Sequence, residues 1–267
     1  MDNSPSCTFY PFFHQGRPPS RADRFAGGTL SMRAAQYCDA ITTASGFGWW
    51  VFAPVEILLT WDGTAIFWSK DGEQWHIIND TVQFPGFPGA FDAEAPQALQ
   101  GMAPPFLTSL PEPGQIQVSL GLFARVSPGW SLSVRRPPNF ALPGHLQHFE
   151  GIVDTNEWFG PLFVNLRLTQ TGVPVRLHGD MPLAQLQPIP NFLLTPNALP
   201  FETATKIGPN EWDAYRVSVA EPHTRPNRPF GAYAVQQRRK RNVFETPTCP
   251  VLVSGRNDSE PMYKKIP

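Results

Sequence analysis

The segment IQVSLGLFARV, residues 116–126, carries the clearest pattern in the chain. Its even-numbered positions are all apolar, whereas its odd-numbered positions carry Gln, Ser, Gly, Phe and Arg. Side chains of a strand point alternately to opposite faces, so this period of two predicts a β-strand with one buried face. After the turn signal Pro128-Gly129, residues 130–134 continue in the same manner.

Working outward, further segments show the same signals. Residues 55–61 alternate in polarity and end at the turn Asp62-Gly63, and a hairpin signal, Lys70-Asp71-Gly72, separates two short apolar runs. These runs are residues 65–68 and 75–78, and further short strands are predicted at residues 162–169, 173–177 and 183–189. Short strands divided by Gly- and Pro-containing turns favour an antiparallel sandwich or barrel. We therefore expect a mainly β fold with few short helices.

Composition supports this class and excludes others. The 267 residues include 31 prolines and 21 glycines, which leaves little room for long helices because an interior proline costs a helix roughly 3 kcal/mol. Helical bundles, coiled coils and helical repeats are therefore excluded. Aromatic residues make up 12% of the chain, which argues against a disordered protein because such side chains need burial.

The chain divides into two parts on these patterns. Residues 1–190 are predicted to form one mainly β domain, with an irregular N-terminal arm over residues 1–28 and a short helix within 31–43. A long loop with one helical turn is expected at residues 84–114, which are rich in Pro and Gly. Residues 191–267 are read as a C-terminal extension with one short helix, at 210–221, and a basic segment.

Charge and cysteine usage bear on partners and compartment. The formal net charge is −1, so no overall field favours nucleic acid, and we expect neither a nucleic-acid partner nor a membrane partner. The basic segment, residues 225–241, is either a solvated linker or a phosphate contact. Cys7, Cys38 and Cys249 are too few and too scattered for a disulfide framework. With no signal-peptide pattern at the N-terminus, we expect a soluble protein of the bacterial cytoplasm.

One region resembles a known superfamily. The segments EGIVDTNEWFG (150–160) and HGDMPLAQL (178–186) are similar to the G-[VI]-[VI]-D…Y-x-G and G-D-x-I-A-Q-L motifs of the dUTPase and dCTP deaminase superfamily. Upstream, GWSLSVRRP (129–137) occupies the place of the strand that ends in Arg-Ser in that family. The resemblance implies a β-clip fold, a distorted β-roll, over a core of residues 116–190. It also implies a homo-oligomer, since members of the superfamily assemble as trimers.

The resemblance further implies a set of site residues. Asp154 matches the aspartate that activates a water, and Trp158 matches the aromatic residue under the sugar after one inserted residue is allowed. Gln185 matches the glutamine near the phosphates, and Arg135 and Arg136 stand where an anionic group would be clamped. At 165 the sequence has Asn where the deaminases carry a catalytic Glu, and a neutral amide cannot act as a general acid or base.

The chain as a whole also resembles an uncharacterised bacterial family known only as a domain of unknown function. The similar segments are Gly48-Trp49-Trp50, Thr60-Trp61-Asp62-Gly63, Gly129-Trp130, Arg136-Pro137-Pro138-Asn139 and Glu150-Gly151-Ile152-Val153. This resemblance implies no activity.

A second candidate site is a metal centre. His145, His148, Glu150 and His178 supply two imidazoles, a carboxylate and a further imidazole, the ligand types of non-haem iron oxygenases. A divalent metal ion would be the cofactor. On a straight strand His145 and His148 point to opposite faces, so joint binding requires a bend.

Three functions remain open on the sequence. The first is a small-molecule, metabolite-tailoring enzyme with a pocket near the Asp154 turn and Asp154 as base. The second is a non-catalytic ligand-binding or assembly module, and the third is the metal-dependent oxygenase. A group of tryptophans could line an aromatic pocket, although aromatic residues on strands more often fill a core. Its members are Trp49, Trp50, Trp61, Trp68 and Trp75.

Overall fold

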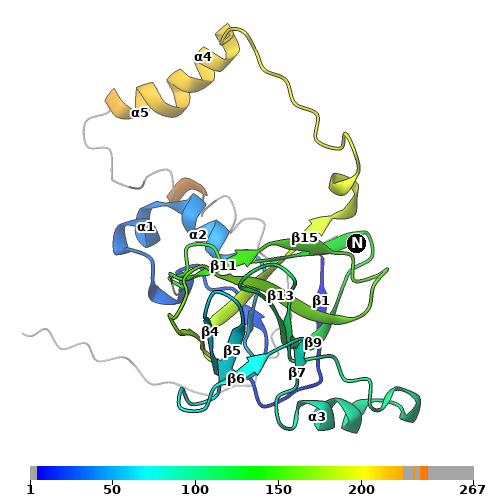
Figure 1. Cartoon of the computed structure of the whole chain (residues 1–267). Helices are drawn as coiled ribbons and strands as arrows, with labels where there is room; N and C mark the ends of the chain where they lie inside the picture. The colour runs from blue at the N-terminus through cyan, green and yellow to red at the C-terminus, as the bar shows by residue number, and fades with distance from the viewer. Residues whose placement is uncertain (1–4, 143, 225–230, 232–234, 238, 240–267) are drawn as a thin grey trace, which may run out of the picture.

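The computed structural model describes residues 5–142, 144–224, 231, 235–237 and 239 of the chain. Three antiparallel sheets dominate it, joined by short helices and turns (Figure 1). The prediction of a mainly β fold with few short helices is confirmed, and the sheets of the described residues do not close into a barrel. The basic segment 225–241 lies almost entirely outside the described residues.

The largest sheet is built on β9 (Gln115–Val126), which contains the alternating segment 116–126. Its order is β11 (Leu146–Phe149), β13 (Pro161–Leu168), β9, β8 (Leu107–Ser109) and β7 (Thr81–Val82), and β1 (Cys7–Pro11) pairs with the second half of β9. All six even-numbered side chains of β9 from Ile116 to Val126 are buried, as predicted. Four alternate side chains of β13, from Leu162 to Leu168, are buried in the same core.

A bend at Gly121 divides β9 into two halves. Gly121 has a φ of +67°, and its carbonyl oxygen accepts hydrogen bonds from the N–H groups of Phe12 and Phe13. A Cβ at this position would lie 3.1 Å from the Pro54 side chain, so glycine fits both the backbone angle and the close approach. The bend lets the first half of β9 pair with β8 and the second half with β1.

The second sheet holds much of the region that resembles the dUTPase motifs. Its order is β12 (Gly151–Val153), β10 (Trp130–Arg135), β15 (Pro182–Pro190), β3 (Trp49–Phe52) and β2 (Ser20–Arg21). Strand β15 is buried on both faces over residues 182–188. Hydrogen bonds from its Gln185 to the carbonyls of Ala44 and Phe47 show that the end of helix α2 (Asp39–Gly46) covers one of those faces.

The third sheet contains the two hairpins that the sequence predicted at the turns Asp62-Gly63 and Lys70-Asp71-Gly72. Its order is β14 (Val175–Leu177), β4 (Ile57–Trp61), β5 (Ile66–Ser69) and β6 (His76–Ile78). Asp62 Oδ1 accepts the N–H groups of Thr64 and Ala65, and this side-chain turn connects β4 to β5. Asp71 makes the corresponding turn between β5 and β6, so both predicted turns are confirmed.

Three segments differ from their predictions. The N-terminal arm contains β1 and β2, because pairing with β9 and β3 orders it in ways that its own sequence does not signal. The helix expected at residues 31–43 is two helices, α1 (Met32–Tyr37) and α2, which meet at Cys38 with extended dihedral angles. The loop expected at residues 84–114 contains helix α3 (Phe87–Glu94), a 3-10 turn, η2 (Gln97–Leu99), and β8.

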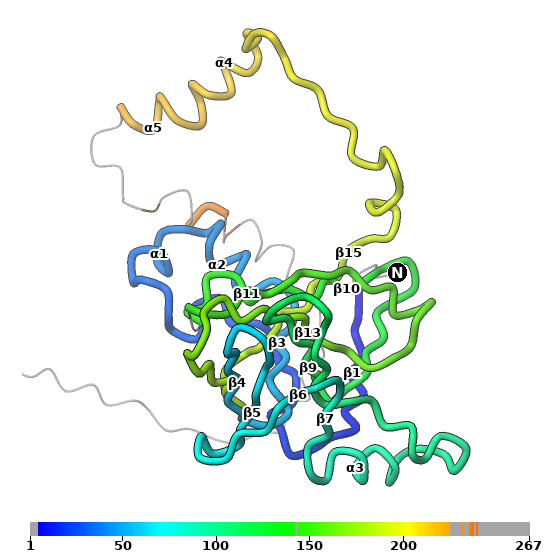
Figure 2. The backbone as a smooth tube through the Cα atoms, viewed as in Figure 1, coloured from blue at the N-terminus to red at the C-terminus, as the bar shows by residue number. Residues whose placement is uncertain are grey.

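The C-terminal extension leaves the sheets at the end of β15. It begins with the 3-10 turn η3 (Asn191–Leu194), continues without regular structure through residues 195–208, and then forms three consecutive helical pieces, α4 (Pro209–Tyr215), η4 (Arg216–Ala220) and α5 (Glu221–Thr224). The helix predicted at 210–221 is therefore confirmed. Figures 1 and 2 show this segment standing away from the three sheets. No helix among the described residues has the length and apolar character needed to cross a membrane.

Candidate functional site

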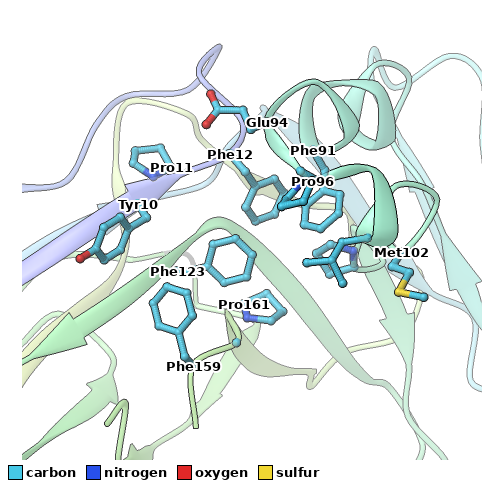
Figure 3. A pocket seen from close by; sticks show the side chains of 14 residues that line it. Tyr10, Pro11, Phe12, Phe91, Glu94, Pro96, Met102, Phe123, Phe159 and Pro161 are labelled. Carbon is cyan, nitrogen blue, oxygen red and sulfur yellow. The ribbon is translucent and has the colours of Figure 1, made fainter.

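An apolar cavity of about 550 Å³ opens between β1 and β9 on one side and the α3–η2 segment on the other (Figure 3). Its lining is mainly aromatic, aliphatic and proline side chains. The residues are Tyr10, Pro11, Phe12, Phe91, Glu94, Ala95, Pro96, Leu99, Met102, Pro104, Phe123, Phe159, Gly160 and Pro161. This volume and this lining are those of typical small-molecule sites.

The strand-side wall is an aromatic cluster of three rings. Tyr10 of β1 is the register partner of Phe123 of β9, so both side chains leave the sheet on the same face. Phe159, which follows the Asp154 turn, stacks on Phe123 with ring centroids 5.5 Å apart and meets Tyr10 edge-on at 5.7 Å. The guanidinium of Arg125 lies 4.7 Å from the centroid of the Phe159 ring and holds that ring from its outer side.

The opposite wall comes from helix α3 and the turn after it. Phe91 of α3 meets Phe12 edge-on with centroids 5.6 Å apart, and Phe12 in turn lies 5.2 Å from Phe123. These contacts close the floor of the cavity. Leu99 and Met102 remain exposed at its mouth, where a bound molecule would cover them.

One polar pair, Glu94 and His14, lies at the edge of this apolar cavity. Glu94 Oε1 lies 2.8 Å from His14 Nε2, and Glu94 belongs to the cavity lining. Together with the Tyr10 hydroxyl it supplies polar groups at the rim of an otherwise apolar site. Such an arrangement suits a flat apolar molecule with one polar end.

Asp154, the predicted base, lies outside this cavity and within a turn. Its Oδ1 accepts the backbone N–H groups of Asn156 at 2.9 Å and Glu157 at 3.4 Å, and its Oδ2 accepts Nδ2 of Asn191 at 2.7 Å. These hydrogen bonds, the one from Asn156 first, hold the pKa of Asp154 below its usual range. A lowered pKa makes the carboxylate a weaker base, so this geometry gives Asp154 a turn-forming role.

The residues that follow the Asp154 turn nevertheless line the cavity. Phe159, Gly160 and Pro161 line the cavity, and the predicted residue Trp158 lies immediately before them with its indole ring against Gly160. A Cβ at residue 160 would collide with that ring, so the glycine is required there. The aromatic cavity thus borders the last residues of this turn, whereas Asp154, Arg135, Arg136 and Gln185 do not line it.

The predicted arginines and Gln185 belong to the second sheet. Arg135 and Gln185 are register partners on β10 and β15, so the fold does bring these two together. Arg135 Nη2 lies 3.3 Å from Glu150 Oε1, and Arg136 is exposed. Neither arginine lines the aromatic cavity.

Gln185 is fully buried and completely bonded. Its Oε1 accepts the indole N–H of Trp50 at 2.9 Å, and its Nε2 donates to the carbonyl oxygens of Phe47 at 2.7 Å and Ala44 at 3.3 Å. A side chain engaged on both atoms links β15, β3 and α2. Its assignment to substrate binding stays a prediction.

The four predicted metal ligands do not converge. His145 is exposed, Glu150 pairs with Arg135, and His178 Nδ1 lies 3.8 Å from Glu56 Oε2. His148 Nε2 donates to the Leu183 carbonyl at 3.1 Å, and burial lowers the pKa of its imidazole to about 4. Throughout the described ranges, no group of three His, Cys, Asp or Glu side chains is arranged to hold a metal ion.

Comparisons with known proteins leave the family open. No family model matches the chain, and no curated protein matches it. Among solved structures, a mutant of the dUTPase of Staphylococcus bacteriophage 80alpha is similar with a TM-score of 0.35 and 8% identity. The similarity covers 76% of this chain and 98% of that one. A likeness of this extent assigns neither a family nor an activity.

The sequence left two interpretations of its tryptophans open, the core as the favoured one and an aromatic pocket as the other, and none of them lines this cavity, whose rings come from phenylalanines and a tyrosine. Trp50 and Trp68 are buried in the core. A signal for the true cavity was present: Phe123 occupies the face of residues 116–126 that carries Gln and Arg, where solvent was expected. Its aromatic partners Tyr10 and Phe159 are far away in sequence, so their meeting could not be inferred.

Proposed function

We propose that the protein is a small-molecule-binding module whose ligand is flat and largely apolar. The single observation that carries this proposal is the cavity of about 550 Å³ lined by Tyr10, Phe91, Phe123 and Phe159. Aromatic rings offer a large contact area at low entropic cost, and ring–ring contacts add roughly 0.5–1.5 kcal/mol each beyond area burial. Glu94 at the rim favours a ligand whose polar end carries a hydrogen-bond donor.

Binding without catalysis is the form that the geometry supports best. Asp154 is engaged by three hydrogen bonds, and Gln185 is engaged on both of its polar atoms. A metabolite-tailoring enzyme at the same turn remains the alternative, and turnover of a bound ligand that is lost in Asp154→Asn would favour it. The oxygenase hypothesis has less support, because its four candidate ligands are dispersed.

A fragment screen tests the binding proposal. Ligand-observed NMR with a set of neutral and cationic aromatic fragments should detect binders to the wild-type protein. Ala95→Trp should abolish those signals, because Ala95 lines the cavity and an indole there would fill it. Ala93→Trp is the matched control, since Ala93 is exposed on the same helix and does not line the cavity. Equal binding by both variants would refute the proposed site.

We also propose that the protein assembles with copies of itself through the segment 191–224, here called the arm. The arm carries large apolar side chains that are exposed in the single chain. They are Phe192, Leu194, Leu199, Phe201, Ile207, Trp212, Tyr215 and Val217. A concentration of exposed large apolar side chains supports an interaction site in this segment.

The helical end of the arm has one apolar face and one charged face. Trp212, Tyr215 and Val219 recur at helical spacing, and the Trp212 and Tyr215 rings meet edge-on at 6.0 Å. Arg216 of the same segment forms ion pairs with Asp213 and Glu221. An apolar stripe on a helix that stands off the sheets supports packing against another helix.

The size of the arm supports a second copy as its partner. Phe201 is 93% exposed and Phe192 69%, and with Trp212 and Tyr215 they present roughly 500 Å² of aromatic surface. Two arms would together bury roughly 1,000 Å² before any aliphatic side chain is added, close to the roughly 1,200 Å² at which specific interfaces begin.

Light scattering after size exclusion tests the assembly proposal. The wild type should have at least twice the monomer mass, and Phe201→Ser combined with Trp212→Ser should shift it to a monomer. Ile77→Ser is the matched control, because Ile77 is exposed on β6 and lies outside the arm. A monomeric wild type, or a control that dissociates equally, would overturn this proposal.

A further inference from the structure

Two further cavities are lined in part by residues 11–17 and share only Pro11 with the lining of the aromatic cavity. A polar cavity of about 410 Å³ is lined by Arg17, Glu56, Lys70 and Phe84 among others, and a smaller one of about 170 Å³ lies beside it. The two cavities share Gly16, Arg17 and Pro54 in their walls. Arg17 thus borders both the larger polar cavity and the smaller apolar one, and the two cavities together are here called the cleft.

Two cations in this cleft are held by aromatic rings. The guanidinium of Arg17 lies 4.2 Å from the centroid of the Phe52 ring, and Nη1 of Arg17 donates to the Asp180 carbonyl at 2.9 Å. The ammonium of Lys70 lies 5.8 Å from the centroid of the Phe84 ring. Ring stacking and one hydrogen bond fix the Arg17 fork and leave its other N–H groups available to a ligand.

The charge of this cleft is not balanced by its own acids. Glu56 is already bound by Arg176, with Nη1 2.6 Å from Oε1, and by the nearby His178. Asp71, next to Lys70 in sequence, is engaged by the N–H groups of Glu73 and Gln74. Within the described part of the chain, neither Arg17 nor Lys70 has a carboxylate at ion-pair distance. The polar cavity is thus lined by two cations, Arg17 and Lys70, and by one carboxylate, Glu56, which is already paired with Arg176.

We propose that this cleft binds a small molecule that carries a phosphate or carboxylate group on an apolar body. The anion lies between Arg17 and Lys70, where charge-assisted hydrogen bonds are stronger than neutral ones. The apolar body enters the smaller cavity, whose walls include Phe13, Val51 and Leu120 beside the Gly121 bend. The site is separate from the aromatic cavity and does not depend on the function proposed for it.

Calorimetric titration with three probes tests this site. Phenyl phosphate and benzoate represent the two possible anions, and benzyl alcohol is the neutral analogue of similar size. At least one of the anions should bind at least tenfold more tightly than benzyl alcohol, and the anion that binds identifies the headgroup. Lys70→Gln should weaken that binding about tenfold, because it removes one of the two charges.

The controls separate a site from a general charge effect. Lys206→Gln removes an exposed cation on the arm, outside the cleft, and should leave the affinity unchanged. Arg17→Lys keeps the charge but loses the planar fork, so it should also weaken binding. The proposal would be overturned if benzyl alcohol bound as tightly as the anions, or if neither anion bound at millimolar concentration. It would also be overturned if Lys70→Gln left the affinity unchanged, or if Lys206→Gln weakened binding as much as Lys70→Gln does.

Discussion

Phe159 stacks on Phe123 with an interplanar angle of 25°, and this contact joins the end of the Asp154 turn to the bent central strand. The turn positions Phe159, and the pairing of β1 with β9 positions Tyr10 against it. One wall of the aromatic cavity thus depends on two segments that the sequence places far apart. The predictions below test the supports of this arrangement.

Exchanging Asp154 and Asn191 should restore the hydrogen bond that joins their side chains. Asp154→Asn places an NH2 group opposite the NH2 group of Asn191, so the hydrogen bond between the two side chains is lost. The free energy of unfolding should fall by about 1 kcal/mol. In the double variant Asp154→Asn with Asn191→Asp, the new amide at 154 donates to the new carboxylate at 191. Ser131 Oγ, which donates to Asn191 Oδ1 at 2.7 Å in the wild type, can donate to that carboxylate as well. Chemical denaturation of the single and double variants measures the coupling. Strictly additive losses would contradict the assigned hydrogen bond.

Gln185 should prove to be a stabilising residue. Gln185→Leu leaves the buried Trp50 indole N–H without a partner and removes the hydrogen bond to the Ala44 carbonyl, which should cost about 3 kcal/mol of unfolding free energy. Gln117→Leu is the control, because Gln117 bonds Asn165 at the surface and its loss should cost less than about 0.5 kcal/mol. Denaturant midpoints of the two variants provide the test. Equal midpoints would mean that the Gln185 bonds contribute nothing.

His148 should make the fold sensitive to acid. Burial lowers the pKa of its imidazole to about 4 in the folded protein, whereas the unfolded chain titrates near 6.5. Between these values the unfolded state binds more protons, so stability falls as the pH falls from about 7 to 4, by on the order of 2–3 kcal/mol. His148→Gln should flatten that part of the curve of unfolding free energy against pH. A curve with unchanged slope would refute the assignment to His148.

Cys7 should resist alkylation in the native state. Burial raises the pKa of its thiol to about 12, so at pH 8 almost none of it is the reactive thiolate. Mass-spectrometric mapping of iodoacetamide labelling should therefore find Cys7 modified slowly in the folded protein and rapidly in guanidinium chloride. Fast labelling under native conditions would show that β1 opens away from β9.

The sequence predicted strands best where one face is buried and the other is wet. Strands β9 and β13 are of this kind, and their alternation marks them directly. Strand β15 is buried on both faces because α2 covers it, and the cover comes from a segment far away in sequence. The segments of β1 and β2 show no alternation of apolar and polar residues that would predict a strand. They form strands because β1 pairs with a free edge of β9 and β2 with a free edge of β3.

For the candidate site, too, the sequence predicted local features better than features that depend on distant segments. Asp154, Arg135 and Gln185 were chosen from a local motif, and the structure gives the first and last of them hydrogen bonds within the fold. The aromatic cavity needs Tyr10, Phe123 and Phe159 together, and only the tertiary pairing of β1, β9 and the turn achieves that. A bulky aromatic residue on a strand face expected to be wet is the one local sign of such a site.

The most direct test of the account is the dissociation constant of the tightest aromatic fragment for two matched variants. Phe159→Ser removes one ring from the cavity wall, and Phe149→Ser removes a ring from β11 outside the cavity. We predict at least a tenfold weaker affinity for Phe159→Ser, equal to about 1.4 kcal/mol, and an unchanged affinity for Phe149→Ser. The same affinity in both variants would contradict the aromatic cavity as the binding site.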